Sequence, residues 1–265
     1  MSDKALDFVR QTQLPTRDDL AEMLDRIAAA RAMADGQDDG SLAADNTKSG
    51  SVNAGSLTSF TEKLSGQGKS DVQNSTLFAQ LAANYDYDKF TDPMKWYLRY
   101  TEVLGQIGWI NPAFAFKAYN SEKSTFTMNE AVLDILAAIA TANEVAIVAA
   151  TMDGLKSLSD DSKQIAVWDS NSNNGSNGTF QIFPVDQLPN GDVVMVLAGL
   201  QFTANKVTSR FLWFEWSKTS VKIEQAAGKF VLNDDVYKTV RKEIVERLGD
   251  LAKDLVLNIP LKFPS

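Results

Sequence analysis

The sequence has no cysteine and no histidine among its 265 residues. Without cysteine, the chain cannot form disulfides, thiolate metal sites, thiol nucleophiles or S-acylated anchors. Without histidine, it lacks the usual general base near neutral pH and the commonest transition-metal ligand. Any catalysis would therefore depend on Asp, Glu, Lys, Tyr or Ser. We expect no metal and no cofactor, and a non-enzymatic role is favoured over a catalytic one.

Positive charge is also in short supply. The chain has 26 Lys and Arg against 34 Asp and Glu, a formal net charge of −8 at pH 7. This balance repels phosphate backbones and anionic lipid surfaces, and no long Lys/Arg cluster offsets it locally. Nucleic acid is therefore not expected as a partner. The hydrophobic content of 44% is ordinary for a soluble globular protein.

The first fifteen residues, MSDKALDFVRQTQLP, carry acids where a secretory signal needs a basic end followed by an apolar run. We therefore expect synthesis in the cytoplasm without a signal peptide. If the protein acts outside the cell, it leaves by lysis or through a dedicated secretion machine.

A long uninterrupted apolar run is missing as well. The most apolar segment, Ala131–Leu155, is interrupted by Asp134, Glu144 and Asp153. A transmembrane helix needs about 20 consecutive apolar residues, so this segment is not a permanent membrane span. It reads instead as two helical stretches with a turn or kink at Thr141–Glu144. Their apolar faces supply the membrane-contact candidates Val132, Ile135, Leu136, Ile139, Val145, Val148 and Met152.

Two interpretations of Ala131–Leu155 remain open at this point. The first is a buried helix pair that packs on an apolar sheet and stays there. The second is a hairpin that is buried in the soluble form but can detach and enter a membrane, helped by its Ala-rich, weakly packed surface. Core packing is the safer prediction.

Capping signals predict further helices. Thr16 precedes an apolar stripe that ends near Gly36, Asp92 and Pro93 mark another start, Thr127 and Glu130 form a capping box, and Asn233 or Asp234 caps the last helix. A helix is also expected from about 72 to 84. The stretch at about 36–70 is rich in Ser, Gly, Asn and Asp. We interpret residues 1–265 as a single domain with a long Ser/Gly-rich surface loop at about 36–70.

The second half of the chain indicates strands. TFQIFPVDQL, VVMVLAGLQF, SRFLWFEW and KIEQAAGKFVLN are strand-like, QIAVWD is a shorter candidate, and AFAFKAY with STFTM predicts a hairpin. VVMVLAGLQF and RFLWFEW are apolar on both alternating faces and must be covered on both. Asp169–Gly178 has no apolar residue and predicts an exposed loop. The expected fold is α+β: a mainly antiparallel central sheet covered by helices on both faces, a three-layer α/β/α sandwich.

Carboxylates are the only plausible catalytic set, and Glu215 is the strongest candidate. Its aromatic neighbours in RFLWFEW could desolvate it and raise its pKa, as glycosidase acids require. The sequence names no second carboxylate for such a pair. The structural alternative is that Glu215 forms an ion pair with Arg210 or Lys218 at a strand end.

This architecture, a two-faced sheet wrapped by helices in a cysteine-free chain, resembles two classes of insect-associated bacterial proteins. It is similar in length and element order to the Evf-type virulence factors, and it also resembles the cytolytic delta-endotoxin (Cyt) class. The resemblance implies a protein that acts at host membranes without catalysis. The Evf type is associated with an acylated cysteine, which this chain lacks, so side chains would have to make any membrane contact.

Three functions follow. The leading hypothesis is a non-enzymatic bacterial virulence factor or toxin-like protein, with a host membrane or its own copies as partner. The first alternative is a soluble binding or assembly module that uses the loop Gly36–Ser70 or the loop Asn171–Asn177. The second is a carboxylate-only hydrolase built around Glu215.

Overall fold

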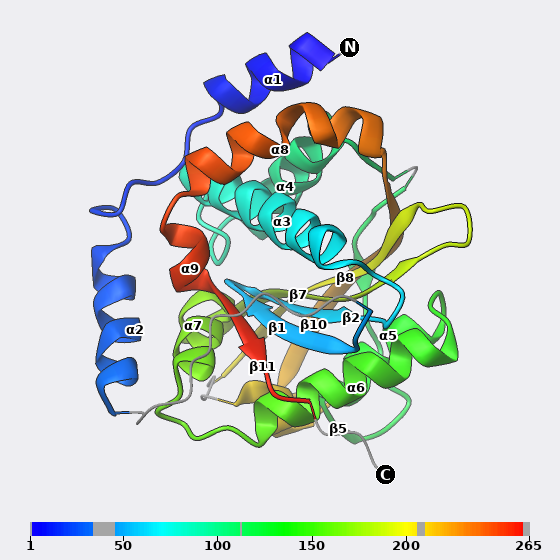
Figure 1. The fold of residues 1–265 in the computed structure, drawn as a ribbon. Coiled ribbons are helices and arrows are strands. Elements are labelled where there is room, and N and C mark those ends of the chain that lie inside the picture. Colours follow the sequence, from blue (N-terminus) through cyan, green and yellow to red (C-terminus); the bar gives the residue numbers. More distant parts are fainter. Residues whose placement is uncertain (1, 34–45, 112, 206–209, 262–265) are drawn as a thin grey trace.

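The computed structural model describes residues 2–33, 46–111, 113–205 and 210–261 (Figure 1). Within these ranges a nine-stranded sheet crosses the molecule, and a two-stranded ribbon, β5 and β9, lies apart from it. The path of the sheet is β11-β1-β2-β7-β8-β10-β3, with β4 paired to β10 and β6 to β7. The strands are β1 (Ser49–Asn53), β2 (Ser56–Phe60), β3 (Trp109–Ile110), β4 (Lys117–Ala118), β5 (Thr125–Thr127), β6 (Asn173–Asn174), β7 (Asn177–Gln187), β8 (Val193–Ala204), β9 (Glu215–Ser217), β10 (Val221–Leu232) and β11 (Val256–Ile259).

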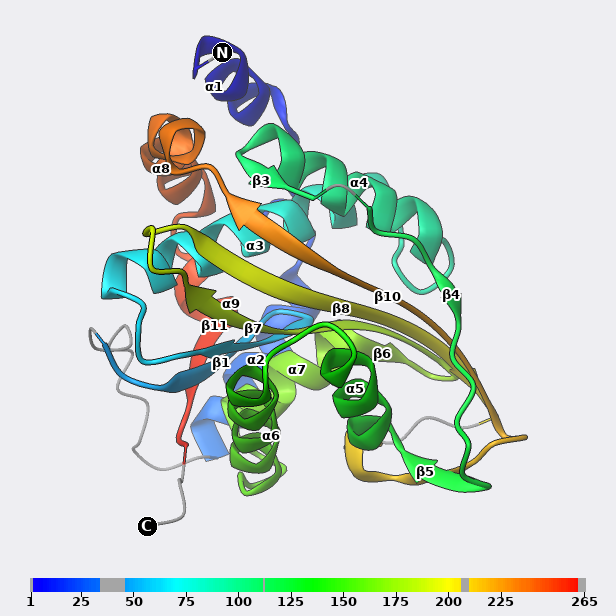
Figure 2. The ribbon, with the colours of Figure 1, turned by 90° about the vertical axis from the view of Figure 1, so that its right-hand side faces the viewer.

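Helices cover both faces of this sheet (Figure 2). One layer contains α3 (Gly66–Asp86), α4 (Pro93–Gln106) and α8 (Asp234–Leu248), and the opposite layer contains α5 (Met128–Ala137), α6 (Ala142–Lys156) and α7 (Lys163–Ser172). At the periphery, α1 (Ser2–Gln11) packs on α8 and α2 (Ala21–Met33) packs on α7. The short helices α9 (Leu251–Leu255) and η1 (Phe211–Trp213) complete the described elements.

The predicted fold class is confirmed. The sheet is antiparallel except where β2 runs parallel to β7. The long strands β7 and β8 are buried along almost their whole length, as two-sided apolar strands require. Side chains from both faces of β8, such as Val196 and Leu197, are fully buried.

The prediction of a surface loop at about 36–70 is wrong for residues 46–70. Residues 36–45 lie outside the part of the chain that the structure describes. Residues 49–60 form the buried hairpin β1–β2, and α3 starts at Gly66. The polar side chains of β1 are buried because α3 supplies their partners: Gln73 Nε2 donates to Ser51 Oγ at 3.0 Å, and Asn53 Nδ2 donates to Thr76 Oγ1 at 2.9 Å. Polar composition indicated exposure, but buried polar groups are stable when they are hydrogen-bonded.

Four other segment predictions are wrong. QIAVWD belongs to α7, whose N-cap Ser162 accepts a hydrogen bond from the Ile165 amide, and the same helix runs into the expected loop Asp169–Gly178. The segments AFAFKAY and STFTM do not pair with each other, because β4 joins β10 and β5 joins β9. SRFLWFEW is broken by the left-handed backbone of Arg210 (φ 63°), which starts η1 and leaves only Glu215–Ser217 as strand.

A buried lysine lies in the connection between α3 and α4. Lys89 is 6% exposed, and its Nζ lies 5.3 Å from the centroid of the Trp96 ring. No carboxylate in the described ranges forms an ion pair with it. Burial lowers the pKa of Lys89 from 10.5 to about 7, and the charge of Asp88 opposes this shift only in part. The backbone of Gly55 adjoins Nζ, where a Cβ would clash with the ammonium.

This burial makes folding stability depend on pH. Between pH 7 and 10.5 the unfolded chain binds a proton at Lys89 that the folded protein does not hold, so stability rises with pH across this window. The substitution Lys89→Met should raise stability at neutral pH and flatten this part of the profile. Urea denaturation of both proteins across the window measures the difference, with the exposed Lys222→Met as control. Parallel profiles for the wild type and Lys89→Met would contradict the assignment.

Candidate binding groove beside helix α5 and strand β9

Helices α5 and α6 form a hairpin in which each helix has its own capping box. In the first, the Thr127 amide donates to Glu130 Oε2 at 2.8 Å; in the second, the Thr141 amide donates to Glu144 Oε2 at 2.6 Å. The predicted box at Thr127 is thus confirmed, and the break expected at Thr141–Glu144 is the start of α6. The reciprocal bonds fix both helix starts, because each satisfies otherwise orphaned backbone donors.

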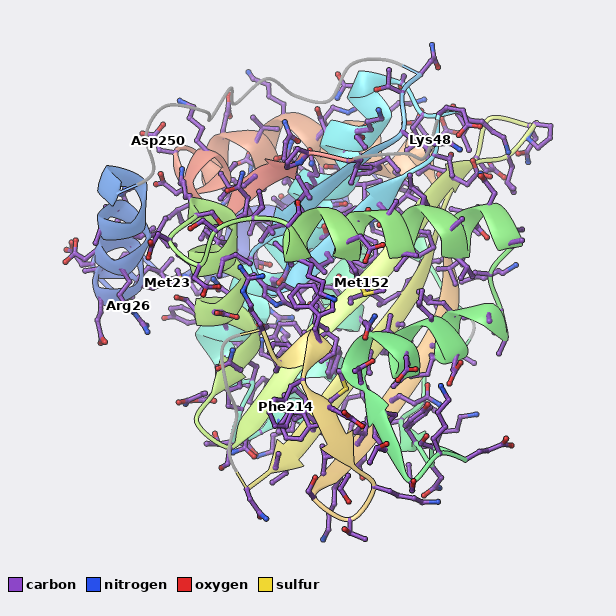
Figure 3. All side chains as sticks on the ribbon, turned by 90° about the horizontal axis from the view of Figure 1, so that it is seen from below. Met23, Arg26, Lys48, Met152, Phe214 and Asp250 are labelled. Carbon is purple, nitrogen blue, oxygen red and sulfur yellow. The ribbon has the colours of Figure 1, made fainter. Side chains whose placement is uncertain are left out.

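Most of the membrane-contact candidates on this hairpin face the core. Side chains of Val132, Leu136 and Val148 are fully buried, Met152 is 1% exposed, and Ile135 is 7% exposed. Figure 3 shows Met152 at α6, above the sheet. Ile139 and Val145 are half-buried at the outer edge. No helix within the described ranges combines the length and apolarity needed to cross a membrane.

Burial of these side chains supports the core interpretation. Exposing an apolar side chain of this size to water costs about 1.5–3 kcal/mol. Releasing the four most buried of them would cost roughly 6–12 kcal/mol, which is comparable to the whole stability of a domain. Close packing adds to this: a Cβ on Gly50 of β1 would lie 2.7 Å from two side-chain atoms of Thr151 in α6.

An open groove of about 600 Å³ lies where the start of α5, the ribbon β5–β9 and the end of α6 meet. These elements gather on one side of the sheet in Figure 2. The groove is lined by Lys123, Thr125, Phe126, Thr127, Asn129, Glu130, Lys156, Trp213 and Glu215. The sequence candidate Glu215 therefore lies in a cavity that contains a second carboxylate.

One pair of charges in the groove is fixed. Lys123 Nζ donates to Glu130 Oε1 at 2.8 Å, while Glu130 Oε2 accepts from the Thr127 amide. The hydrogen bond from Lys123, followed by those from Thr127, lowers the pKa of Glu130 to about 2. Glu130 is consequently ionised at every physiological pH and is not a proton donor.

Glu215 and Lys156 carry the other two charges of the groove. Register across the ribbon pairs Glu215 with Thr127, so both side chains project from the same face of the ribbon. Glu215 is exposed, and neither its carboxylate nor Lys156 Nζ takes part in an ion pair in the described part of the chain. The predicted partner Arg210 instead forms an ion pair with Asp160. Two opposite charges thus line one groove without an ion-pair partner among the described residues.

Trp213 provides the aromatic wall. Its side chain is half-buried, and its indole Nε1 is shielded from solvent without a hydrogen-bond partner among the described residues. Buried donors are normally hydrogen-bonded, but other described donors, such as Trp168 Nε1, are also without a partner, so this feature alone does not mark a ligand site.

The hydrolase hypothesis requires a desolvated acid next to a second carboxylate. Glu215 is exposed, and Glu130 is held ionised. The carboxyl group whose pKa burial does raise, to about 6, belongs to Asp169 in α7, which is not among the residues that line the groove. The groove therefore contains two carboxylates without the acid that glycoside hydrolysis needs.

A phosphate-loop interpretation fails at another site. The segment Gly66-Gln67-Gly68-Lys69-Ser70 opens α3, which follows strand β2 after a short loop, and this order resembles the strand–loop–helix setting of such loops. However, Lys69 is buried, and its Nζ donates to the Thr47 carbonyl at 2.6 Å. This lysine anchors the chain that leads into β1.

Sequence reasoning found Glu215 and the capping role of Glu130 but missed Lys123, Lys156 and Trp213 as their neighbours. The missing information was the pairing of β5 with β9, which brings residues 125–127 next to 215–217. A three-residue ribbon leaves almost no periodic signal, and Trp213 was expected in a longer strand.

Comparison with known proteins gives distant structural likeness alone. No family model matches the chain, and no curated protein sequence is similar to it. Among solved structures, the fold is similar to that of the Evf virulence factor at 14% identity and a TM-score of 0.37, over 70% of this chain and 72% of that one. The resemblance to the Evf type is thus shown as a distant structural likeness, which assigns no function. Likeness to the Cyt class stays a prediction.

Removing the ammonium that fixes Glu130 should release its carboxyl. In Lys123→Met, we expect the pKa of Glu130 to rise from about 2 toward the ordinary value of 4.5, and to stop short of it because the Thr127 hydrogen bonds persist. A carboxyl-carbon NMR titration measures this directly. The exposed Lys117→Met on β4 is the matched control. An unchanged Glu130 pKa would show that Lys123 is not its principal partner.

Proposed function

We propose that this protein acts by binding rather than by catalysis, and that the groove between α5, α6 and the ribbon β5–β9 holds its target. The observation that carries the proposal is a pair of opposite charges, Glu215 and Lys156, which form no ion pair with any described residue and line the groove with the half-buried Trp213. A cavity of a few hundred Å³ with convergent polar groups is the usual form of a small-ligand site.

Hydrogen bonds and side-chain packing hold several residues of the groove in place. Glu130 and Lys123 are locked by the capping box and by their own ion pair. Glu215 extends from a strand whose neighbour Trp216 is buried in the aromatic cluster of Phe202 and Phe211. Preorganised charges on fixed elements bind with less loss of side-chain freedom than charges on mobile loops. This arrangement supports binding without demanding any proton transfer.

A screen of small polar molecules by ligand-observed NMR tests the proposal. We expect hits whose binding perturbs the amide signals of residues 123–130, 156 and 213–217, and we expect Glu215→Gln and Lys156→Met each to weaken them. The matched controls are Glu102→Gln and Lys222→Met, which lie outside the groove. Hits that map elsewhere, or binding that the two groove variants leave unchanged, would refute the proposal.

A second candidate function is contact with host membranes, as expected of a virulence factor or toxin-like protein. The observation that favours it is the outer surface of the α5–α6 hairpin, where Ala137, Ala138, Ala142 and Ala146 are exposed. Small apolar side chains there lower the polarity of the surface that a membrane would meet. Such contact could occur on the intact surface or after release of the hairpin.

A disulfide distinguishes these two modes of contact, since the chain has no cysteine to interfere. The double substitution Gly50→Cys and Thr151→Cys places two thiols where β1 and α6 are in contact, and should lock α6 to the sheet. Vesicle flotation is then measured in the oxidised and reduced forms. We expect equal flotation in both if the intact surface makes the contact. Loss of flotation on oxidation would show that membrane contact requires release of the hairpin. Absence of flotation in both forms would contradict the membrane proposal.

A further inference from the structure

We infer that the groove recognises a zwitterion in which a quaternary ammonium and a phosphate are a few bonds apart, as in phosphocholine. This inference rests on the proposed function, because it names the ligand class of the same groove. It follows from the number, sign and pairing of the charges that face the cavity, together with the aromatic ring among them.

The four charges that line the groove sum to zero, but among the described residues only two of them are paired, with each other. Glu130 and Lys123 neutralise each other at 2.8 Å, which leaves the Glu215 carboxylate and the Lys156 ammonium for a ligand. A simple anion would be attracted by Lys156 and repelled by Glu215. A simple cation would be attracted by Glu215 and repelled by Lys156. A ligand that carries both signs satisfies both groups, so electrostatic complementarity favours a zwitterion.

The indole of Trp213 favours a quaternary ammonium over other cations at the Glu215 side. Aromatic faces attract cations, tryptophan most strongly, and quaternary ammonium groups use this contact because they donate no N–H hydrogen bond. The groove offers such a cation one aromatic wall and one free carboxylate. A primary ammonium would need several acceptors, and the carboxylate of Glu130 is already engaged by Lys123 and Thr127.

The two lysines that line the groove suit a phosphate. Lys156 Nζ has no ion pair in the described ranges, and Lys123 Nζ has hydrogen-bond capacity beyond its bond to Glu130, because an ammonium has three donors. Phosphate oxygens accept several charge-assisted hydrogen bonds at once. The cavity of about 600 Å³ is open to solvent and can admit a headgroup that stays attached to a larger molecule.

Calorimetric titration of the full chain with phosphocholine tests the inference, with choline, inorganic phosphate and maltose as comparison ligands. We expect phosphocholine to bind more tightly than any of the three, and Glu215→Gln and Lys156→Met each to weaken it about tenfold, the effect of losing one charge-assisted contact. Both residues are exposed, so neither variant should compromise folding, and Lys222→Met should bind as the wild type does.

Flotation with phosphatidylcholine vesicles then assigns the source of the ligand. Binding to these vesicles that soluble phosphocholine competes away indicates a lipid headgroup, whereas binding of phosphocholine alone indicates a soluble molecule; either result supports the inference. If maltose or another neutral molecule occupies the groove and phosphocholine does not, the zwitterion inference fails and the binding function stands. If no molecule of the wider screen reaches the groove, both fail.

Discussion

The fold depends on a layer of buried hydrogen bonds between α3, α4 and the centre of the sheet. At the parallel junction of β2 with β7, Ser56 Oγ donates to Gln181 Oε1 at 2.8 Å, and Gln181 Nε2 donates to the Tyr97 hydroxyl at 3.0 Å. Tyr97 in turn donates to the Phe180 carbonyl at 2.8 Å. This chain of bonds joins the strands β11-β1-β2 to the strands β7-β8-β10 under the helical layer.

Buried polar groups are costly when they lose their partners, so the hydrogen bonds of this layer favour one arrangement of the elements. The β1–β2 hairpin can be rich in serine and asparagine and still lie in the middle of the sheet, because α3 presents glutamine and threonine to it. The opposite face is different in character. There α5 and α6 bury aliphatic side chains, and their outer edge together with the ribbon β5–β9 forms the groove.

Local signals in the sequence were reliable wherever one interaction decided the outcome. The Thr127–Glu130 box and the Asn233 cap mark real helix starts, because such a cap is satisfied within three residues. Helix α4 also begins at Pro93 as predicted, although its N-cap Asp92 makes no side-chain capping hydrogen bond. The apolar runs of β7 and β8 also predicted these strands correctly. Prediction failed for β1 and β2, because their burial depends on hydrogen-bond partners about twenty residues away in α3. It also failed for α7, because the apolar residues of that helix surround it and so show no helical period.

The candidate site also combines a residue that the sequence made recognisable with contacts that only the fold reveals. Glu215 was recognisable as a carboxylate among aromatic residues, but its exposure to solvent was not, since exposure depends on where β9 lies. The meeting of Glu215 with Glu130, Lys156 and Trp213 needs the three-residue register between β5 and β9 and the return of α6 across the sheet. No local pattern encodes contacts at such sequence separations.

Composition by itself excluded every site that needs a cysteine or a histidine side chain. Capping residues and hydrophobic periodicity predicted most of the helices and the central strands. The absence of histidine and cysteine limits the titratable and nucleophilic groups regardless of the fold. Only the tertiary structure decided that Ala131–Leu155 is a capped helix pair with its apolar side against the sheet, and that Glu215 and Lys156 share a groove unpaired. The physical reason is that burial and charge pairing are properties of neighbours in space, which the chain brings together from distant positions.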